Sequence, residues 1–187
     1  MMTEKEKMIA GKLYKPSNEE LSKDRYNARL LLNTINTLSP KEEKKRNIAI
    51  QQLIENIDNS LYIEPPFFCE YGYNIIGGKN IYMNFNCCIL DISTVTFGDN
   101  VMLAPNVQIY TATHPLKAKE RNSGLEFGKP IAIGNNVWVG GNSTICPGVT
   151  LGNNVVVGAG SVVTKSFPDN VVIAGNPAKI IKTIDNS

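Results

Sequence analysis

A six-residue repeat in the C-terminal two thirds of the chain limits the folds that it can adopt. Every sixth residue from position 133 to position 163 is aliphatic, and glycine directly follows four of these six residues. The same register continues upstream through Phe97, Leu103 and Ile109. A short fixed period is typical of a solenoid, in which each repeat packs only on its neighbours. The six aliphatic residues are Ile133, Val139, Ile145, Leu151, Val157 and Val163.

A longer unit appears in a phrase made of an apolar residue, glycine, any residue and asparagine. The phrase begins at Phe97, Ile133 and Leu151, so its copies are 36 and 18 residues apart. Eighteen residues are three hexapeptides, which make one turn of a triangular parallel β-helix with one inward aliphatic side chain per short strand. Glycine and asparagine suit its corners because they tolerate positive φ angles. We therefore predict a mainly β chain with a narrow aliphatic core, which agrees with an aromatic content of only 7 %.

The first third of the chain differs in character, because residues 1–60 carry 11 Lys/Arg and 9 Asp/Glu, whereas residues 61–187 carry only 8 and 8. Three helix-capping signals occur there, each a serine or threonine followed by glutamate three residues later. We therefore expect an N-terminal helical segment, 1–60, ahead of a β-helix with a C-terminal tail, 61–187. The capping signals start at Thr3, Ser17 and Ser39, and the first helix is expected to end near Tyr14. The residues expected on the inward helix faces are Leu21, Ala28, Leu31, Leu32 and Ile35, then Ile48, Leu53, Ile54 and Ile57.

Composition excludes several classes of function. A net charge of +2 is too small to favour a nucleic-acid or anionic-membrane partner. No apolar run approaches the ~20 residues that span a bilayer. The charged opening Thr3–Lys7 is unlike a signal peptide. We therefore expect a cytoplasmic protein with no nucleic-acid and no membrane partner.

Four cysteines and one histidine offer few ligands for a metal ion. The cysteines form no CxxC pair, so we expect free thiols in a reducing compartment. A zinc site would have to be assembled from these scattered residues, and no metal site is predicted. The residues concerned are Cys69, Cys87, Cys88, Cys146 and His114.

The repeat fails between Ile109 and Ile133. Register positions 115 and 121 are proline and arginine, which cannot be core aliphatic residues. A loop, residues 110–130, must therefore leave the β-helix, and it contains His114, the only histidine of the chain. Loops on rigid scaffolds often carry catalytic or binding residues.

Phrases along nearly the whole chain resemble the hexapeptide-repeat acyltransferases, and within them the maltose/galactoside O-acetyltransferase family, with the maltose branch closest. This resemblance implies a left-handed β-helix, a homotrimer with active sites between neighbouring subunits, acetyl-CoA as donor and a sugar hydroxyl as acceptor. The phrases are Met8–Tyr14, Tyr71–Asn74, Asn84–Cys87, Ala112–Pro115, Arg121–Gly124, Glu126–Pro130 and Ala174–Ala178.

The resemblance makes His114 the catalytic residue. A sugar hydroxyl is a poor nucleophile near neutral pH, and a neutral imidazole can accept its proton as the oxygen attacks the thioester. None of the four cysteines lies in loop 110–130, so direct transfer is favoured over an acyl-enzyme. Asn84 is expected to fix the acceptor hydroxyl, and Glu126 to bond the sugar or to orient the imidazole. Further residues expected to line the acceptor pocket are Glu70, Tyr82 and Asp91.

Two positions separate the chain from the galactoside branch of the family. That branch carries acidic residues where this chain has Pro16 and Ile92. A maltose- or glucose-type acceptor is therefore expected rather than a galactoside.

For the donor, the resemblance implies backbone groups of the C-terminal coils and basic residues below them. Lysines would match the pyrophosphate and 3′-phosphate of coenzyme A, and a backbone N–H near Gly141 would stabilise the oxyanion. Lys165 is expected on the cleft wall opposite His114. Trp138 is expected either in the cleft wall or in core or trimer packing. The predicted donor-binding residues are Gly141, Ala159, Thr164, Lys165, Lys179 and Lys182.

Three other functions compete with this one. A γ-type carbonic anhydrase needs three histidine ligands, which a chain with one histidine does not supply. A non-catalytic β-helix assembly module is the second alternative, because repeat folds often only bind. An acetyltransferase for another acceptor, either a non-sugar such as serine or a xenobiotic amide, or an amino sugar, is the third. Turnover of acetyl-CoA with different acceptors discriminates among them.

Overall fold

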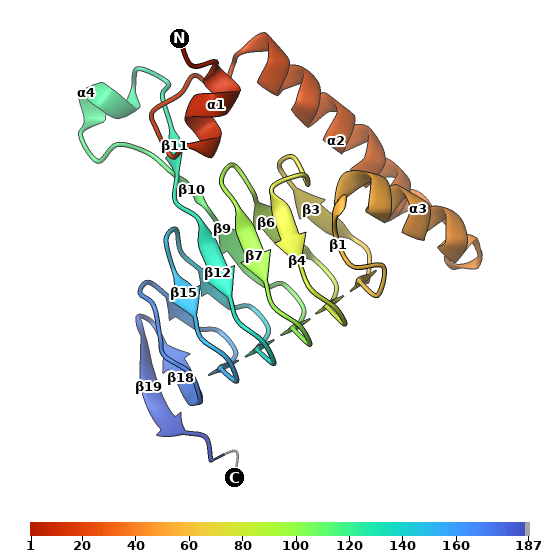
Figure 1. The fold of residues 1–187 in the computed structure, drawn as a ribbon, viewed down its shortest axis with the longest axis vertical. Helices are drawn as coiled ribbons and strands as arrows, with labels where there is room; N and C mark the ends of the chain where they lie inside the picture. Colours follow the sequence, from red (N-terminus) through yellow and green to blue (C-terminus); the bar gives the residue numbers. More distant parts are fainter. Residues whose placement is uncertain (186–187) are drawn as a thin grey trace.

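Short parallel strands wind into a three-faced β-helix in the computed structural model, which describes residues 1–185 (Figure 1). Strands of successive coils stack in parallel, so the predicted β-helix is confirmed. Face 1 contains, in order, β1 (Asn56–Ile57), β4 (Ile75–Gly77), β7 (Val95–Phe97), β12 (Ile131–Ile133) and β15 (Thr150–Leu151). Face 2 contains β2 (Tyr62–Ile63), β5 (Tyr82–Met83), β8 (Met102–Leu103), β13 (Trp138–Val139), β16 (Val156–Val157), β18 (Val171–Gly175) and the antiparallel β19 (Ala178–Thr183). Face 3 contains β3 (Phe67–Cys69), β6 (Cys87–Leu90), β9 (Gln108–Tyr110), β14 (Thr144–Ile145) and β17 (Val162–Val163).

The core is a set of aliphatic columns that run along the β-helix axis. Ile133 pairs with Phe97 in one neighbouring coil and with Leu151 in the other. All nine residues of the predicted six-residue register are buried, and the most exposed of them, Phe97, is 5 % exposed. Because each inward side chain stacks on its counterpart one coil away, aliphatic side chains fill the column with Phe97 as its one aromatic member among these nine residues.

The corner between face 1 and face 2 explains the recurring glycine–asparagine phrase. A Cβ atom added at Gly134 would lie 2.6 Å from the carbonyl oxygen of Gly152, so the coils can stack only where this residue is glycine. Asn136 has a φ of 55° and donates from its side chain to Asn154 at 3.1 Å. The same ladder extends through five asparagines with positive φ, namely Asn80, Asn100, Asn136, Asn154 and Asn170.

Three α-helices and a short 3-10 helix precede the strands, but their ends differ from the prediction. The capping box of Thr3 and Glu6 is confirmed, yet α1 stops at Ile9 because Gly11, with a φ of 66°, turns the chain. The cap of the second helix is Asn18, whose side chain accepts from two backbone N–H groups, and not Ser17. Ser39 caps a 3-10 turn rather than an α-helix. The bounds are α1 (Glu4–Ile9), α2 (Glu19–Thr37), the 3-10 helix (Pro40–Glu42) and α3 (Glu43–Leu53).

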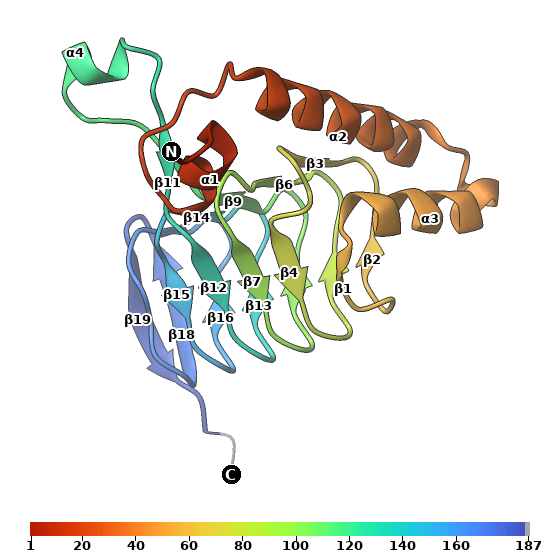
Figure 2. The same cartoon turned by 45° about the horizontal axis from the view of Figure 1, so that its top comes forward.

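Helices α2 and α3 cover the first coils and share their core (Figure 2). Leu32 and Ile35 of α2 join the same buried cluster as Phe67 of face 3. Ile48 is 56 % exposed, against prediction, because Ala49 and Ile50 occupy the inward face of α3 instead. Within residues 1–185 no helix has the length and hydropathy needed to cross a membrane.

The predicted loop 110–130 is confirmed as an excursion from the β-helix. Its base is a small antiparallel pair of β10 (Ala112–Thr113) and β11 (Phe127–Gly128), and α4 (Ala118–Arg121) forms its far end. Thr111 anchors the base, because its hydroxyl donates to the Leu90 carbonyl at 2.6 Å. Both views place α1 beside this pair, at the same end of the molecule as α2 (Figures 1 and 2).

Candidate active site

Most of the predicted site residues lie on two edges of the β-helix. Turns from face 2 to face 3 form edge 2/3, and turns from face 3 to face 1 form edge 3/1. The face between them is wide, since the four residues of β6 alone span ~13 Å at about 3.3 Å each. Edge 2/3 carries Asn84, Gly141 and Ala159. Edge 3/1 carries Glu70, Asp91, His114, Glu126, Thr164 and Lys165.

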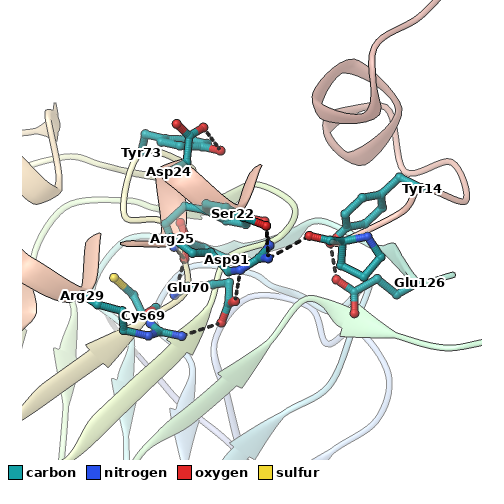
Figure 3. A network of polar contacts seen from close by, with 12 residues as sticks. Tyr14, Ser22, Asp24, Arg25, Arg29, Cys69, Glu70, Tyr73, Asp91 and Glu126 are labelled. Atoms are coloured by element: carbon teal, nitrogen blue, oxygen red, sulfur yellow. Dashed lines mark hydrogen bonds and ion pairs between the residues drawn. The ribbon is translucent and has the colours of Figure 1, made fainter. Parts of the chain in front are cut away.

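His114 follows β10 on the excursion and faces Glu126. Its Nε2 lies 3.8 Å from Oε2 of Glu126, and the side chains are 53 % and 17 % exposed. This separation allows a charge–charge interaction with a protonated ring but exceeds hydrogen-bond length. The other carboxylate oxygen, Oε1, accepts a hydrogen bond from the Tyr14 hydroxyl (Figure 3). One oxygen of Glu126 is thus held by Tyr14, while the other faces the imidazole.

Glu70 is joined to helix α2 by two arginines. Its carboxylate lies 3.6 Å from Nε of Arg25 and 3.3 Å from Nη2 of Arg29 (Figure 3). Arg29 also donates to the Cys69 carbonyl at 2.6 Å, and Arg25 to the Tyr71 hydroxyl at 2.8 Å. Helix α2 therefore holds the turn that carries Glu70, which is the first turn of edge 3/1.

Asp91 does not line an open pocket, which corrects the expectation for this residue. Its side chain is completely buried, and its carboxylate accepts backbone N–H groups of Glu70, Tyr71 and Gly72 at 2.9, 2.9 and 2.7 Å. Burial raises the pKa of Asp91 to about 6, although these three bonds act in the opposite direction. Asp91 supports the turn of Glu70 instead of contacting an acceptor.

We expect Asp91→Asn to change how stability depends on pH. Because the carboxyl pKa is about 6 in the folded chain and 3.8 in the reference state, the stabilisation from this group is full below pH 3.8 and is lost as pH rises through 6. Denaturant unfolding at pH 4 and pH 7 should therefore show the wild-type advantage over Asp91→Asn shrinking by about 2–3 kcal/mol. An advantage that stays constant between the two pH values would contradict the raised pKa.

Asn84 and Tyr82 lie at edge 2/3 and on the outer side of face 2. The Asn84 side-chain oxygen accepts the N–H of Phe85 at 2.8 Å, which leaves its NH₂ group without a protein partner within residues 1–185. The Tyr82 ring stacks on Tyr62 of the preceding coil, with centroids 5.9 Å apart. Within one chain, both residues are on the far side of face 3 from His114.

The predicted donor-binding residues are also divided between the two edges. Gly141 and Ala159 occupy stacked turns, where an added Cβ at Gly140 would lie 2.6 Å from the backbone nitrogen of Ala159. Thr164 and Lys165 are exposed at edge 3/1. Lys165 therefore shares an edge with His114, which corrects the expectation that it lies on the opposite wall.

Lys179 and Lys182 project from the outer side of face 2. Lys182 is opposite Val172, and this row continues through Val156 to Trp138. Residues directly opposite each other on paired strands point to the same side of a sheet. Trp138 is 50 % exposed and belongs to this outer row, so core packing is excluded for it.

Four residues near the candidate site were not predicted from the sequence. They are Tyr14, Arg25, Arg29 and Lys129. Lys129 lies along edge 3/1, since an added Cβ at Gly148 in the next coil would lie 3.3 Å from its side chain. Tyr14 ends the phrase Met8–Tyr14, which was the one available signal for it. The two arginines lie in a helix whose charges gave no sign of pairing with the β-helix.

Comparison with known proteins agrees with this fold. Residues 7–58 match the family model described as the maltose acetyltransferase hexapeptide capping motif, and residues 130–165 match the hexapeptide repeat of succinyl-transferase. The crystal structure of a maltose O-acetyltransferase from Clostridium difficile 630 has a TM-score of 0.97 and 49 % identity, with 99 % of each chain covered. A galactoside acetyltransferase solved in complex with coenzyme A has a TM-score of 0.95 and 42 % identity, covering 100 % of this chain and 93 % of that one.

Sequence comparison gives the same result. The galactoside O-acetyltransferase of Escherichia coli strain K12 is 43 % identical over 181 residues, which are 97 % of this chain and 89 % of that protein. Identity at this level over nearly the full length shows that the chain belongs to the maltose/galactoside O-acetyltransferase family of hexapeptide-repeat acetyltransferases.

Proposed function

We propose that the protein is an acetyl-CoA-dependent O-acetyltransferase that transfers acetyl directly to a hydroxyl group of a maltose- or glucose-type sugar. The observation that carries the proposal is the half-exposed imidazole of His114, which faces a carboxylate on a loop outside the β-helix. His114 is the only histidine of the chain, and imidazole is the side chain best suited to accept a hydroxyl proton near pH 7. The relative solved with coenzyme A supports acetyl-CoA as the donor.

In the proposed reaction, the acceptor oxygen attacks the thioester carbonyl carbon while its proton passes to the ring of His114. The tetrahedral intermediate then collapses and the C–S bond breaks. The departing thiolate takes the proton from the imidazolium, so that His114 becomes neutral again. Oε2 of Glu126, 3.8 Å from Nε2, faces the positive charge that the ring acquires in this step.

We propose further that the active site forms between subunits of a homotrimer. Asn84 and His114 lie on different edges of one chain, and four of the predicted donor-binding residues are divided between the same edges. A cleft between edge 3/1 of one subunit and edge 2/3 of the next would bring the two halves together. In that cleft a backbone N–H at Gly141 would stabilise the oxyanion.

The acceptor is proposed from two residues, Ile92 on edge 3/1 and Pro16 in the segment between α1 and α2. Ile92 is buried against the backbone of Gly128 and offers no hydrogen-bonding side chain. Pro16 contributes only its carbonyl oxygen, which accepts from Arg25 at 2.7 Å. The galactoside branch has acidic residues at both positions, so this chain lacks two groups that could bond a galactoside.

The test is a screen of purified protein with acetyl-CoA against glucose, maltose, a galactoside, serine and chloramphenicol, in which release of free thiol is measured. We expect glucose or maltose to give the highest kcat/KM. Turnover mainly with serine or chloramphenicol would replace the sugar acceptor. Binding of acetyl-CoA without turnover of any acceptor would favour the assembly module.

We also propose a cytoplasmic location. All four cysteines are free thiols, at positions 69, 87, 88 and 146. Burial raises the pKa of each thiol, so the thiols are chemically quiet rather than catalytic. Free cysteines are usual in a reducing compartment.

A further inference from the structure

The N-terminal segment meets the catalytic loop in a short antiparallel bridge between Tyr14 and Glu126. The backbone N–H of Tyr14 donates to the Glu126 carbonyl at 3.0 Å, and that of Glu126 donates to the Tyr14 carbonyl at 3.3 Å. The Tyr14 hydroxyl adds a third hydrogen bond, to the Glu126 carboxylate. Three hydrogen bonds therefore join two residues that are 112 positions apart in the sequence.

The Tyr14 ring is fixed on all sides. It is 0 % exposed, and the turn before it packs closely on the loop, because an added Cβ at Gly11 would lie 3.1 Å from the Gly128 carbonyl oxygen. A ring packed in this way holds its hydroxyl at one place at the base of the loop. The residues buried in the same cluster are Met8, Leu21, Tyr71 and Ile92.

From these contacts we propose that Tyr14 is a positioning residue for acetyl transfer, whose hydroxyl holds the Glu126 carboxylate in place beside the His114 imidazole. The inference rests on the proposed role of His114 as general base. Since Tyr14 takes Oε1 of Glu126, the carboxylate cannot rotate freely, and Oε2 stays 3.8 Å from Nε2. The N-terminal segment thereby acts on the reacting group as well as covering the first coils.

The surrounding charges leave this interaction without a competitor. Arg25 of α2 is directed to Tyr71 and Glu70, and Arg121 of the loop donates to two backbone carbonyls. Among residues 1–185, His114 is the only basic side chain within ion-pair distance of Glu126. Burial and then the Glu126 carboxylate raise the pKa of Tyr14, which keeps the hydroxyl protonated as a donor.

The first test is Tyr14→Phe, which keeps the buried ring and removes only the hydroxyl. We expect kcat to fall about tenfold while the KM for acetyl-CoA stays within twofold, because the lost contact acts on the base and not on the donor. Tyr73→Phe is the matched control. It removes the hydroxyl of a neighbouring, partly buried tyrosine, and that hydroxyl donates to Asp24 at 3.2 Å rather than to Glu126, so its kcat should equal that of the wild type.

The second test separates positioning from packing. We expect Tyr14→Phe to change kcat less than twofold in a Glu126→Ala background, since the hydroxyl then has no carboxylate to hold. An equal loss in both backgrounds would show that the hydroxyl acts through packing, and would overturn the proposal. Thermal unfolding of each variant identifies any that has lost its fold.

A spectroscopic readout needs no acceptor and no activity. Because the chain has one histidine, histidine labelled with ¹³C at Cε1 alone gives a single imidazole signal without assignment. Tyr14→Phe and Glu126→Ala should both shift this signal, and Tyr73→Phe should not. An imidazole signal and a kcat that Tyr14→Phe leaves unchanged would refute the positioning role.

The two proposals fail in different ways. If His114→Ala keeps its activity while Tyr14→Phe shifts the imidazole signal, His114 is not the general base. Tyr14 then still positions Glu126 beside His114, but this contact does not serve catalysis. If His114→Ala is inactive while Tyr14→Phe resembles the wild type in both readouts, only the positioning role falls.

Discussion

Replacing His114 with alanine is expected to lower kcat by about 10²–10⁴, which is the usual contribution of a general base. The acetyl-CoA dissociation constant should change little, because the donor-binding residues proposed above do not include the histidine. No other imidazole exists in the chain to replace the lost one. The thiol-release assay gives kcat, and calorimetric titration with acetyl-CoA gives the dissociation constant.

Lys117→Ala is the matched control for this variant. Lys117 lies three residues further along the same loop, its side chain is 82 % exposed, and its one ionic contact within residues 1–185 is with Glu120. Its replacement should leave kcat unchanged. A His114→Ala enzyme with more than half of the wild-type activity would exclude the general-base mechanism.

The same mechanism requires a rise of kcat/KM with pH through the neutral range. Only the neutral imidazole accepts a proton, so protonation of the ring at lower pH stops the reaction. The rise should vanish in His114→Ala. A flat wild-type profile, measured where the chemical step limits the rate, would argue against imidazole as the base.

The β-helix could be predicted from the sequence because its determinants are local and repeated. A column residue such as Ile133 needs only an aliphatic neighbour one coil away, and Gly134 needs only the backbone of the next coil beside it. Both requirements recur at a fixed spacing, so they appear directly as a period. The excursion at 110–130 could be predicted for the same reason, as the place where the period stops.

The helix ends were less predictable, since several residues can cap one helix. Ser17 and Asn18 are adjacent, and both residue types are good caps. The structure uses Asn18, whose side chain accepts from the N–H groups of Glu20 and Leu21. The preference depends on where the preceding turn leaves the chain, which is a tertiary property.

The surroundings of the candidate site could not be predicted, because they join distant segments. Tyr14 and Glu126 meet only when the N-terminal segment packs on the excursion. Asp91 has the composition of a ligand-binding residue, but its burial depends on the turn that folds over it. Residue type alone could not show whether its carboxylate serves a substrate or the backbone.

If the active site lies between subunits, mixing two inactive variants is expected to restore activity. His114→Ala damages edge 3/1 and Asn84→Ala damages edge 2/3, so neither homotrimer has an intact cleft. In trimers reassembled from equal amounts, a cleft is complete when an intact edge 3/1 meets an intact edge 2/3. Random assembly gives about one quarter of clefts this combination, so about one quarter of wild-type activity should return.

A second pair of variants tests whether the edges define the two walls. His114→Ala and Glu126→Ala damage the same edge. Each cleft takes its edge 3/1 from one subunit, so in a mixed trimer that wall always lacks either His114 or Glu126. This pair should therefore show no activity beyond the sum of its members, and native mass spectrometry of tagged subunits would verify that mixed trimers formed. If mixed trimers of the first pair form without recovery of activity, each active site lies within one chain. A fully active monomer in light scattering would lead to the same conclusion. Because face 3 lies between the edges that carry Asn84 and His114, a site within one chain would have to function without one of these two residues.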